Sequence, residues 1–278
     1  MGRLLSIELF KLRYSRASKV LLIFYFAGLC LLTFLSSVKI NFWIFDISLA
    51  EEGIFEFPFV WHLSTYVVSW FKFFPLFVIV SMISTEYSNK TIKQNLIDGM
   101  SKKEFVLSKF LVAGVLAAFT TLFVFALGLI LGLVYSTNTS ADVIFTDLSY
   151  LVALFVKLYC FFSFGLFLGV LIKRSAFAIG ALLIWYIFEK IMIYGILGAM
   201  YAREMRDSIG GYFPLQAMEN MVPEPITRME GVQQMSKMGG AMYSPEEYWV
   251  QMPSLIITVI WSLIFMYLSY VLIKKRDL

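Results

Sequence analysis

Long runs of apolar residues dominate the chain and alternate with short polar segments. Each run spans at least 19 residues, and an α-helix needs about 20 residues to cross a hydrocarbon layer about 30 Å thick. We therefore predict an all-α integral membrane protein with six transmembrane helices. The predicted spans cover residues 20–38, 64–84, 110–134, 150–172, 175–199 and 253–273.

The segments between and before these spans complete a single predicted domain over residues 1–278. Only Lys173 and Arg174 separate the fourth span from the fifth, which predicts a tight helical hairpin. Residues 1–18 are basic and carry leucines at helical spacing, which favours an interfacial helix lying on anionic membrane lipids. The alternative for this segment is a disordered basic leader. Proline and glycine residues interrupt residues 200–252, so we expect a small extracytoplasmic cap there rather than one long helix.

Composition supports the membrane assignment and excludes several other classes. The chain is 60% hydrophobic and 15% charged, whereas soluble domains are about 25% charged. Two cysteines inside apolar runs cannot supply a disulfide framework, and a single histidine excludes a histidine-rich metal site.

The distribution of basic residues predicts the orientation in the membrane. Segments 1–19, 85–109, 173–174 and 274–278 together carry 15 lysines and arginines, against five in the segments on the other side. Because cytoplasmic segments are enriched in lysine and arginine, we expect both termini in the cytoplasm. The net charge of +4 is the remainder of two opposed charge layers, so it does not indicate a nucleic-acid partner.

The segment between the second and third spans contains two patterns that mark the start of a helix. Thr91 with Gln94 and Ser101 with Glu104 both fit the capping-box spacing. Gly99 lies where a glycine would end the first of these helices. We expect a short helix, a break, and a second helix that continues into the third span.

A short helix that projects from the membrane is suited to docking in a groove of another protein. The candidate apolar contacts are Ile92, Leu96 and Ile97, and the candidate polar contacts are Lys90, Lys93 and Asp98. The alternative is an ordinary loop that contains two capped helices.

The segment from Glu86 to Lys109 also resembles a known family. It reads E-Y-x-x-K-T-x-K-Q-N-L-x-D-G-x-S-K-K-E-F-x-x-S-K, which is similar to the coupling region of ABC-2-type permeases, the membrane subunits of ATP-binding-cassette exporters. Glu8-Leu9-Phe10-Lys11 resembles the opening of that family. One departure is Lys90, which stands where many members carry glycine.

The resemblance implies a permease subunit that moves a substrate out of the cytoplasm across a bacterial cytoplasmic (inner) membrane. Energy would come from two copies of a separate ABC ATPase, which would bind ATP and Mg. The permease would form a homodimer or a heterodimer with a related permease. Residues 88–98 would be the coupling helix, residues 1–18 the connecting helix, and the second and fifth spans would line the route. The residues implied in ATPase coupling are Glu86, Lys90, Thr91, Ile92, Lys93, Gln94, Leu96 and Asp98.

The chain lacks the common catalytic motifs. It contains no G-x-x-x-x-G-K-[ST] phosphate loop, no H-E-x-x-H, no C-x-x-C and no G-x-S-x-G. We therefore expect neither catalytic residues nor a metal site or cofactor in this chain.

Four charged residues lie within the predicted spans: Lys72, Lys157, Glu189 and Lys190. A charge at mid-span costs about 2.5–3.5 kcal/mol on insertion scales, so such residues usually face a partner or water. One interpretation is a polar vestibule on the export path, with Glu189 paired to Lys72 or Lys157. The other is that the lysines extend to the outer membrane surface. With the aromatic centre of the second span, the candidate path residues are Phe71, Lys72, Phe74, Lys157, Glu189 and Lys190.

Two other functions remain open from the sequence. A secondary transporter or channel would work without an ATPase and would need its own coupling-ion sites. A membrane scaffold would bind an ATPase without transporting anything.

Overall fold

The fold is a bundle of helices with one short hairpin. The computed structural model describes residues 2–37, 40–42, 45–47, 53–228 and 248–276. In chain order the elements are α1 (Gly2–Tyr14), α2 (Arg16–Ser37), β1 (Ile40–Phe42), β2 (Phe45–Ile47), α3 (Phe59–Trp70), α4 (Phe73–Ser88), α5 (Thr91–Ile97), α6 (Lys102–Tyr135), α7 (Ala141–Ile144), α8 (Ser149–Ile172), α9 (Ser175–Lys190), the π-helix η1 (Ile191–Leu197), α10 (Gly198–Met200), α11 (Arg203–Gly210), α12 (Pro214–Asn220), the 3₁₀ helix η2 (Ile226–Arg228) and α14 (Met252–Lys275).

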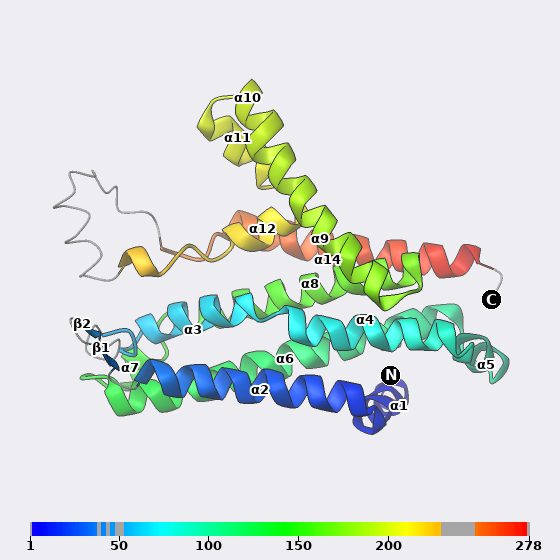
Figure 1. Ribbon diagram of the computed structural model, residues 1–278, viewed down its shortest axis with the longest axis horizontal. Coiled ribbons are helices and arrows are strands. Elements are labelled where there is room, and N and C mark those ends of the chain that lie inside the picture. The colour runs from blue at the N-terminus through cyan, green and yellow to red at the C-terminus, as the bar shows by residue number, and fades with distance from the viewer. Residues whose placement is uncertain (1, 38–39, 43–44, 48–52, 229–247, 277–278) are drawn as a thin grey trace.

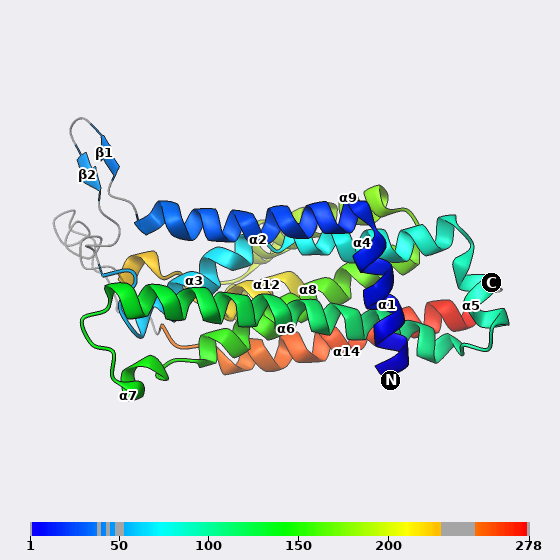
Figure 2. The same ribbon diagram turned by 90° about the horizontal axis from the view of Figure 1, so that it is seen from below.

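The long helices run side by side along the long axis of the molecule (Figures 1 and 2). The antiparallel β1–β2 hairpin lies at one end of the bundle, and α5 lies at the other end with α1 and the end of α14. Both ends of the chain therefore lie at the α5 end.

Length and apolar composition make several of these helices candidates for membrane spans. Five segments of the described chain qualify on their own, and the count is six if α3 and α4 are one bent span. The predicted all-α class is confirmed, with the short β1–β2 hairpin as its one exception among the described residues. The separate short helices α11 and α12 agree with the predicted interruption of residues 200–252, of which 229–247 lie outside the described residues.

The second predicted span is not one straight helix. Residues 64–84 fall on α3 and α4, whose axes differ by 46°. Pro75 has no amide hydrogen to donate to the carbonyl of Phe71, and its ring would crowd that carbonyl in a continuous helix. The chain therefore breaks at Phe71 and Lys72 and begins again as α4, where Pro75 lies in the first turn.

Helix α8 occupies the centre of the bundle, against α4, α6, α9 and α14. Gly165 and Gly169, four residues apart on α8, face α4. A Cβ on Gly165 would lie 2.3 Å from the Leu76 side chain, and one on Gly169 would lie 2.5 Å from Ile83. This spacing of small residues lets the two helices approach closely, as in other membrane bundles.

Local signals in the sequence set several helix ends. The predicted hairpin at Lys173 and Arg174 is confirmed, because α8 ends at Ile172 and α9 begins at Ser175. The capping box of Ser101 and Glu104 is also confirmed, and α6 continues without a break into the third span. Residues 2–14 form a helix that lies across α6, so the disordered-leader alternative is wrong.

The predicted capping role of Thr91 is wrong. Lys90 occupies the N-cap position of α5, so Thr91 is already the first helical residue. Its hydroxyl donates backwards to the carbonyl oxygen of Glu86 at 3.4 Å instead of accepting from Gln94.

We expect Gly169→Leu to destabilise the bundle by about 1–3 kcal/mol, because the added side chain must displace Ile83 from a filled interface. Thermal unfolding of the purified chain in mild detergent measures the effect. The control is Gly28→Leu on α2, where an added Cβ meets nothing within 4 Å. Equal melting temperatures for the two variants would contradict close α4–α8 packing at Gly169.

Candidate functional site

The short helix α5 lies between two residues that have positive φ angles. Lys90 before it has φ 56°, a left-handed conformation that glycine adopts without steric cost. This is the position at which the resemblance described above leads us to expect glycine. Gly99 after the helix has φ 94°, as expected for a glycine that ends a helix.

One side of α5 is anchored to the bundle and the other side is open. Ile92 is only 2% exposed and packs in the core, with Leu96 partly buried beside it. Ile97 is 69% exposed, and Lys93 and Gln94 are exposed as well. The structure thus gives Ile92 an anchoring position within the chain and leaves Ile97 as the apolar residue available to a partner.

A charge cluster lies where α1, α4 and α6 meet, and three of its four members are buried. It consists of Glu8 and Lys11 of α1, Glu86 of α4 and Lys109 of α6. Lys109 Nζ lies 2.5 Å from Glu8 Oε2 and 2.5 Å from Glu86 Oε1. Lys11 Nζ lies 3.0 Å from Glu8 Oε1 and 2.8 Å from Glu86 Oε1. The two carboxylates and two ammonium groups balance, and together they join three helices.

The two carboxylates of the cluster change the pKa of Lys11. Burial by itself lowers the pKa of Lys11, but the hydrogen bonds and negative charges of Glu86 and Glu8 outweigh it and raise that pKa above its ordinary value. Glu86, predicted as a coupling residue, is buried in this cluster and does not lie on the surface. Glu8 and Lys109 stood in the family-like motifs, but nothing in the sequence pattern showed that they meet.

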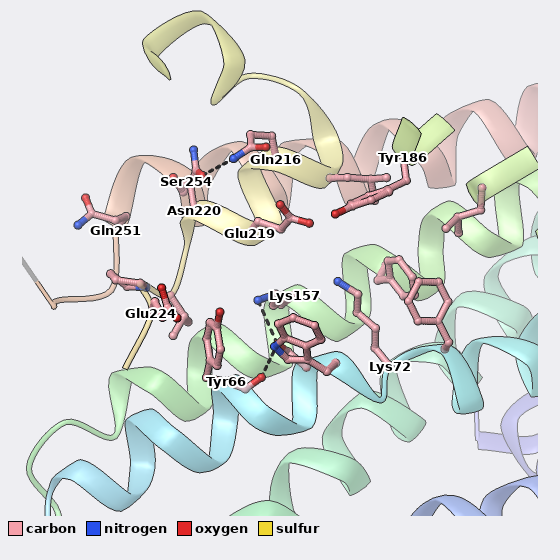
Figure 3. Close-up of a pocket in the computed structure, with 18 of the residues that line it drawn as sticks. Tyr66, Lys72, Lys157, Tyr186, Gln216, Glu219, Asn220, Glu224, Gln251 and Ser254 are labelled. Atoms are coloured by element: carbon pink, nitrogen blue, oxygen red, sulfur yellow. Dashed lines mark hydrogen bonds between the residues drawn. The ribbon is translucent and has the colours of Figure 1, made fainter. Parts of the chain in front are cut away.

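The second candidate region is a cavity of about 1040 Å³. It lies where the α3–α4 bend, α8, α9 and α12 come together (Figure 3). Lys72 projects into it from the bend and Lys157 from α8, facing Glu219 of α12. Two tyrosines, Tyr66 and Tyr186, lie on either side of the two lysines.

The predicted path residues divide between this cavity and its surroundings. Lys72 and Lys157 line it. Lys190 borders it, since its ammonium pairs with Glu219 at 2.5 Å. Phe71 is partly buried and packs against the core, and Phe74 stacks on Tyr25 of α2 with ring centroids 6.4 Å apart. Neither phenylalanine is among the cavity-lining residues.

The predicted pairing of Glu189 with Lys72 or Lys157 is wrong. Its carboxylate accepts hydrogen bonds from the backbone amides of Leu215 at 3.1 Å and Gln216 at 3.0 Å, and from Trp185 Nε1 at 2.6 Å. These two amides belong to the first turn of α12 and have no partner within that helix. A carboxylate there also complements the positive end of the helix dipole. Glu189 therefore fixes α12, which carries Glu219 to the cavity wall.

Sequence reasoning missed α12 as part of the site. Pro214 at the first position of the helix is a recognisable start signal, but it does not show which carboxylate caps the helix. No group of three or more possible metal ligands occurs in the described part of the chain.

We expect Lys109→Met to release α1 from the bundle. The change leaves Glu8 and Glu86 buried with a deficit of positive charge, which costs about 3–5 kcal/mol of stability. Hydrogen–deuterium exchange of α1 amides should accelerate strongly. The matched control is Lys103→Met, an exposed lysine on the same helix. Unchanged exchange in α1 would show that the cluster does not hold this helix.

Comparison with known proteins assigns the chain to a family. The family model described as ABC-2 family transporter protein matches residues 63–278. No curated protein and no solved structure matched the chain. The family match covers the α3–α4 bend, α5, the cavity and every later span, and it agrees with the resemblance of residues 86–109. This chain, a multi-pass membrane protein, therefore belongs to the ABC-2 family of transporter proteins.

Proposed function

We propose that this chain is the permease subunit of an ABC exporter and moves its substrate out of the cytoplasm. ATP hydrolysis would take place on a separate ATPase subunit, which binds ATP and Mg. The observation that carries the proposal is α5, a short helix with an open face at one end of the bundle, within the matched region.

The surroundings of α5 suit a coupling helix. Ile92 secures it to the bundle, and Lys93, Gln94 and Ile97 remain open to a partner. Gln94 Nε2 donates to Asp98 Oδ1 at 3.1 Å, which stiffens the exposed face. A force on this face reaches α4 directly, and α4 runs from Ser88 back to the bend at Lys72 on the cavity.

The proposed assembly is built around the same end of the bundle. The α5 end carries the basic segments, so we place it in the cytoplasm. There two ATPase copies would meet the α5 helices of two permeases, either two copies of this chain or one with a related chain. Exposed Arg3 and Arg13 on α1 suit contact with anionic lipids of the bacterial inner membrane.

The test is co-purification from the native host in mild detergent. We expect an ATP-binding subunit with the wild-type chain, and about tenfold less or lower with Ile97→Asp combined with Lys93→Glu, because both residues lie on the open face of α5. The control is Lys103→Glu, an exposed change outside α5. Ile92 is unsuitable for this test because its replacement would also disturb packing.

Two outcomes would overturn the proposal. Isolation of the intact chain alone, under conditions that preserve other ABC complexes, would favour a stand-alone transporter or channel. A bound ATPase whose hydrolysis never responds to any substrate, with no transport in vesicles, would favour a scaffold.

A further inference from the structure

Neither of the two lysines in the cavity forms an ion pair within the part of the chain that the structure describes. Lys157 is 4% exposed, and its ammonium donates to the Ser69 hydroxyl at 3.3 Å. The Lys72 ammonium lies 4.7 Å from the centre of the Phe161 ring. In the part of the chain that the structure describes, no carboxylate lies within ion-pairing distance of either lysine.

Such an arrangement is costly in a membrane protein. A charge within a span normally faces an opposite charge or water, and here two lysines line the same cavity. The buried position of Lys157 also argues against the sequence-based alternative that it extends to the membrane surface. Figure 3 shows both ammonium groups directed into the cavity.

The nearby carboxylates are already engaged. Glu219 pairs with Lys190 at 2.5 Å, and Glu189 is held by the amides at the start of α12. Glu224, at the other end of the cavity, has contacts of its own. Among the described residues, no carboxylate is therefore free to pair with Lys72 or Lys157, so an anion bound in the cavity would find two positively charged partners there.

The remaining walls are suited to an apolar group. Phe73, Phe161, Leu182 and Leu183 line the cavity beside the lysines. A volume of about 1040 Å³ accommodates a ligand of drug-like or lipid-like size. Positive charge next to an aromatic and aliphatic wall matches a molecule with an anionic head and an apolar tail.

We propose that this cavity binds anionic amphiphiles, with a carboxylate or phosphate between Lys72 and Lys157 and the apolar part against Phe73, Phe161 and Leu182. Charge-assisted hydrogen bonds from both ammonium groups hold the head, and the bound negative charge offsets their positive charges. As the substrate class of the exporter, this inference rests on the proposed function; as a binding property of the chain, it does not need the ATPase.

The experiment uses the full chain alone, purified in dodecyl maltoside. The probe is a dodecanoic acid that carries a photoreactive diazirine in its chain, compared with the dodecylamine analogue at about pH 8, where the first is anionic and the second cationic. Cross-linked residues are located by mass spectrometry. We expect saturable labelling of cavity-lining residues by the acid, competition by dodecyl phosphate, and labelling by the amine that is about tenfold weaker or less.

Variants of the two lysines make the test specific. Lys157→Gln and Lys72→Gln should each weaken saturable labelling by about tenfold, whereas Lys157→Arg should retain most of it because the charge remains. Lys173→Gln, which removes an exposed lysine just beyond the end of α8, should label as wild type. Size-exclusion chromatography identifies any variant that fails to fold. If Lys157→Gln fails to fold, the test rests on Lys72→Gln, because Lys72 is less buried than Lys157.

Equal labelling by acid and amine, or labelling that both glutamine variants leave unchanged, would overturn the inference. Preference for the amine would overturn it as well and would turn attention to Glu219 and Glu224. Competition by phosphatidylglycerol would identify a membrane lipid as the source of the anionic head, and its absence would indicate a single-chain amphiphile. Because no ATPase is present, failure here leaves the proposed permease function standing, and loss of the ATPase partner leaves this result standing.

Discussion

The ion pairs of Lys109 with Glu8 and Glu86 are the contact on which the α5 end of the molecule depends. All three residues are buried, so each charge is stable there only while the others are in place. Through them α1, α4 and α6 meet at one point. Helix α5 connects α4 to α6, and Ile92 packs it against the core. It is therefore attached to a three-helix unit of α1, α4 and α6 that these ion pairs hold together.

The end of α4 that lies away from the charge cluster borders the cavity. Helix α4 carries the cluster residue Glu86 near one end and begins next to Lys72 at the other, where Pro75 forces the bend with α3. The opposite wall is α12, which Glu189 ties to α9 through backbone amides. Under the proposed function, a displacement of α5 would reach one wall of the cavity through α4, while the polar contact of Glu189 holds the other wall.

The sequence was most informative where a local rule decides the structure. Apolar runs predicted the helices, since a chain in a bilayer must satisfy its backbone hydrogen bonds internally. The box of Ser101 and Glu104 and the turn at Lys173 involve neighbouring residues, so they could be predicted as well. Glu189 could not be assigned a partner because backbone amides leave no mark in the sequence pattern. The Glu8–Lys109 pair joins residues 101 positions apart, and several arrangements of the spans would have allowed other pairs.

The most direct test of this three-helix unit is the distance between spin labels at Tyr14 on α1 and Ile97 on α5. Both side chains are exposed, and the native Cys30 and Cys160 can first be replaced by serine and alanine. Electron paramagnetic resonance should show one narrow distance distribution in the otherwise wild-type chain and a broad one when Lys109→Met is added. Identical distributions in the two proteins would contradict the claim that the buried charge cluster holds α1 and α5 as one unit.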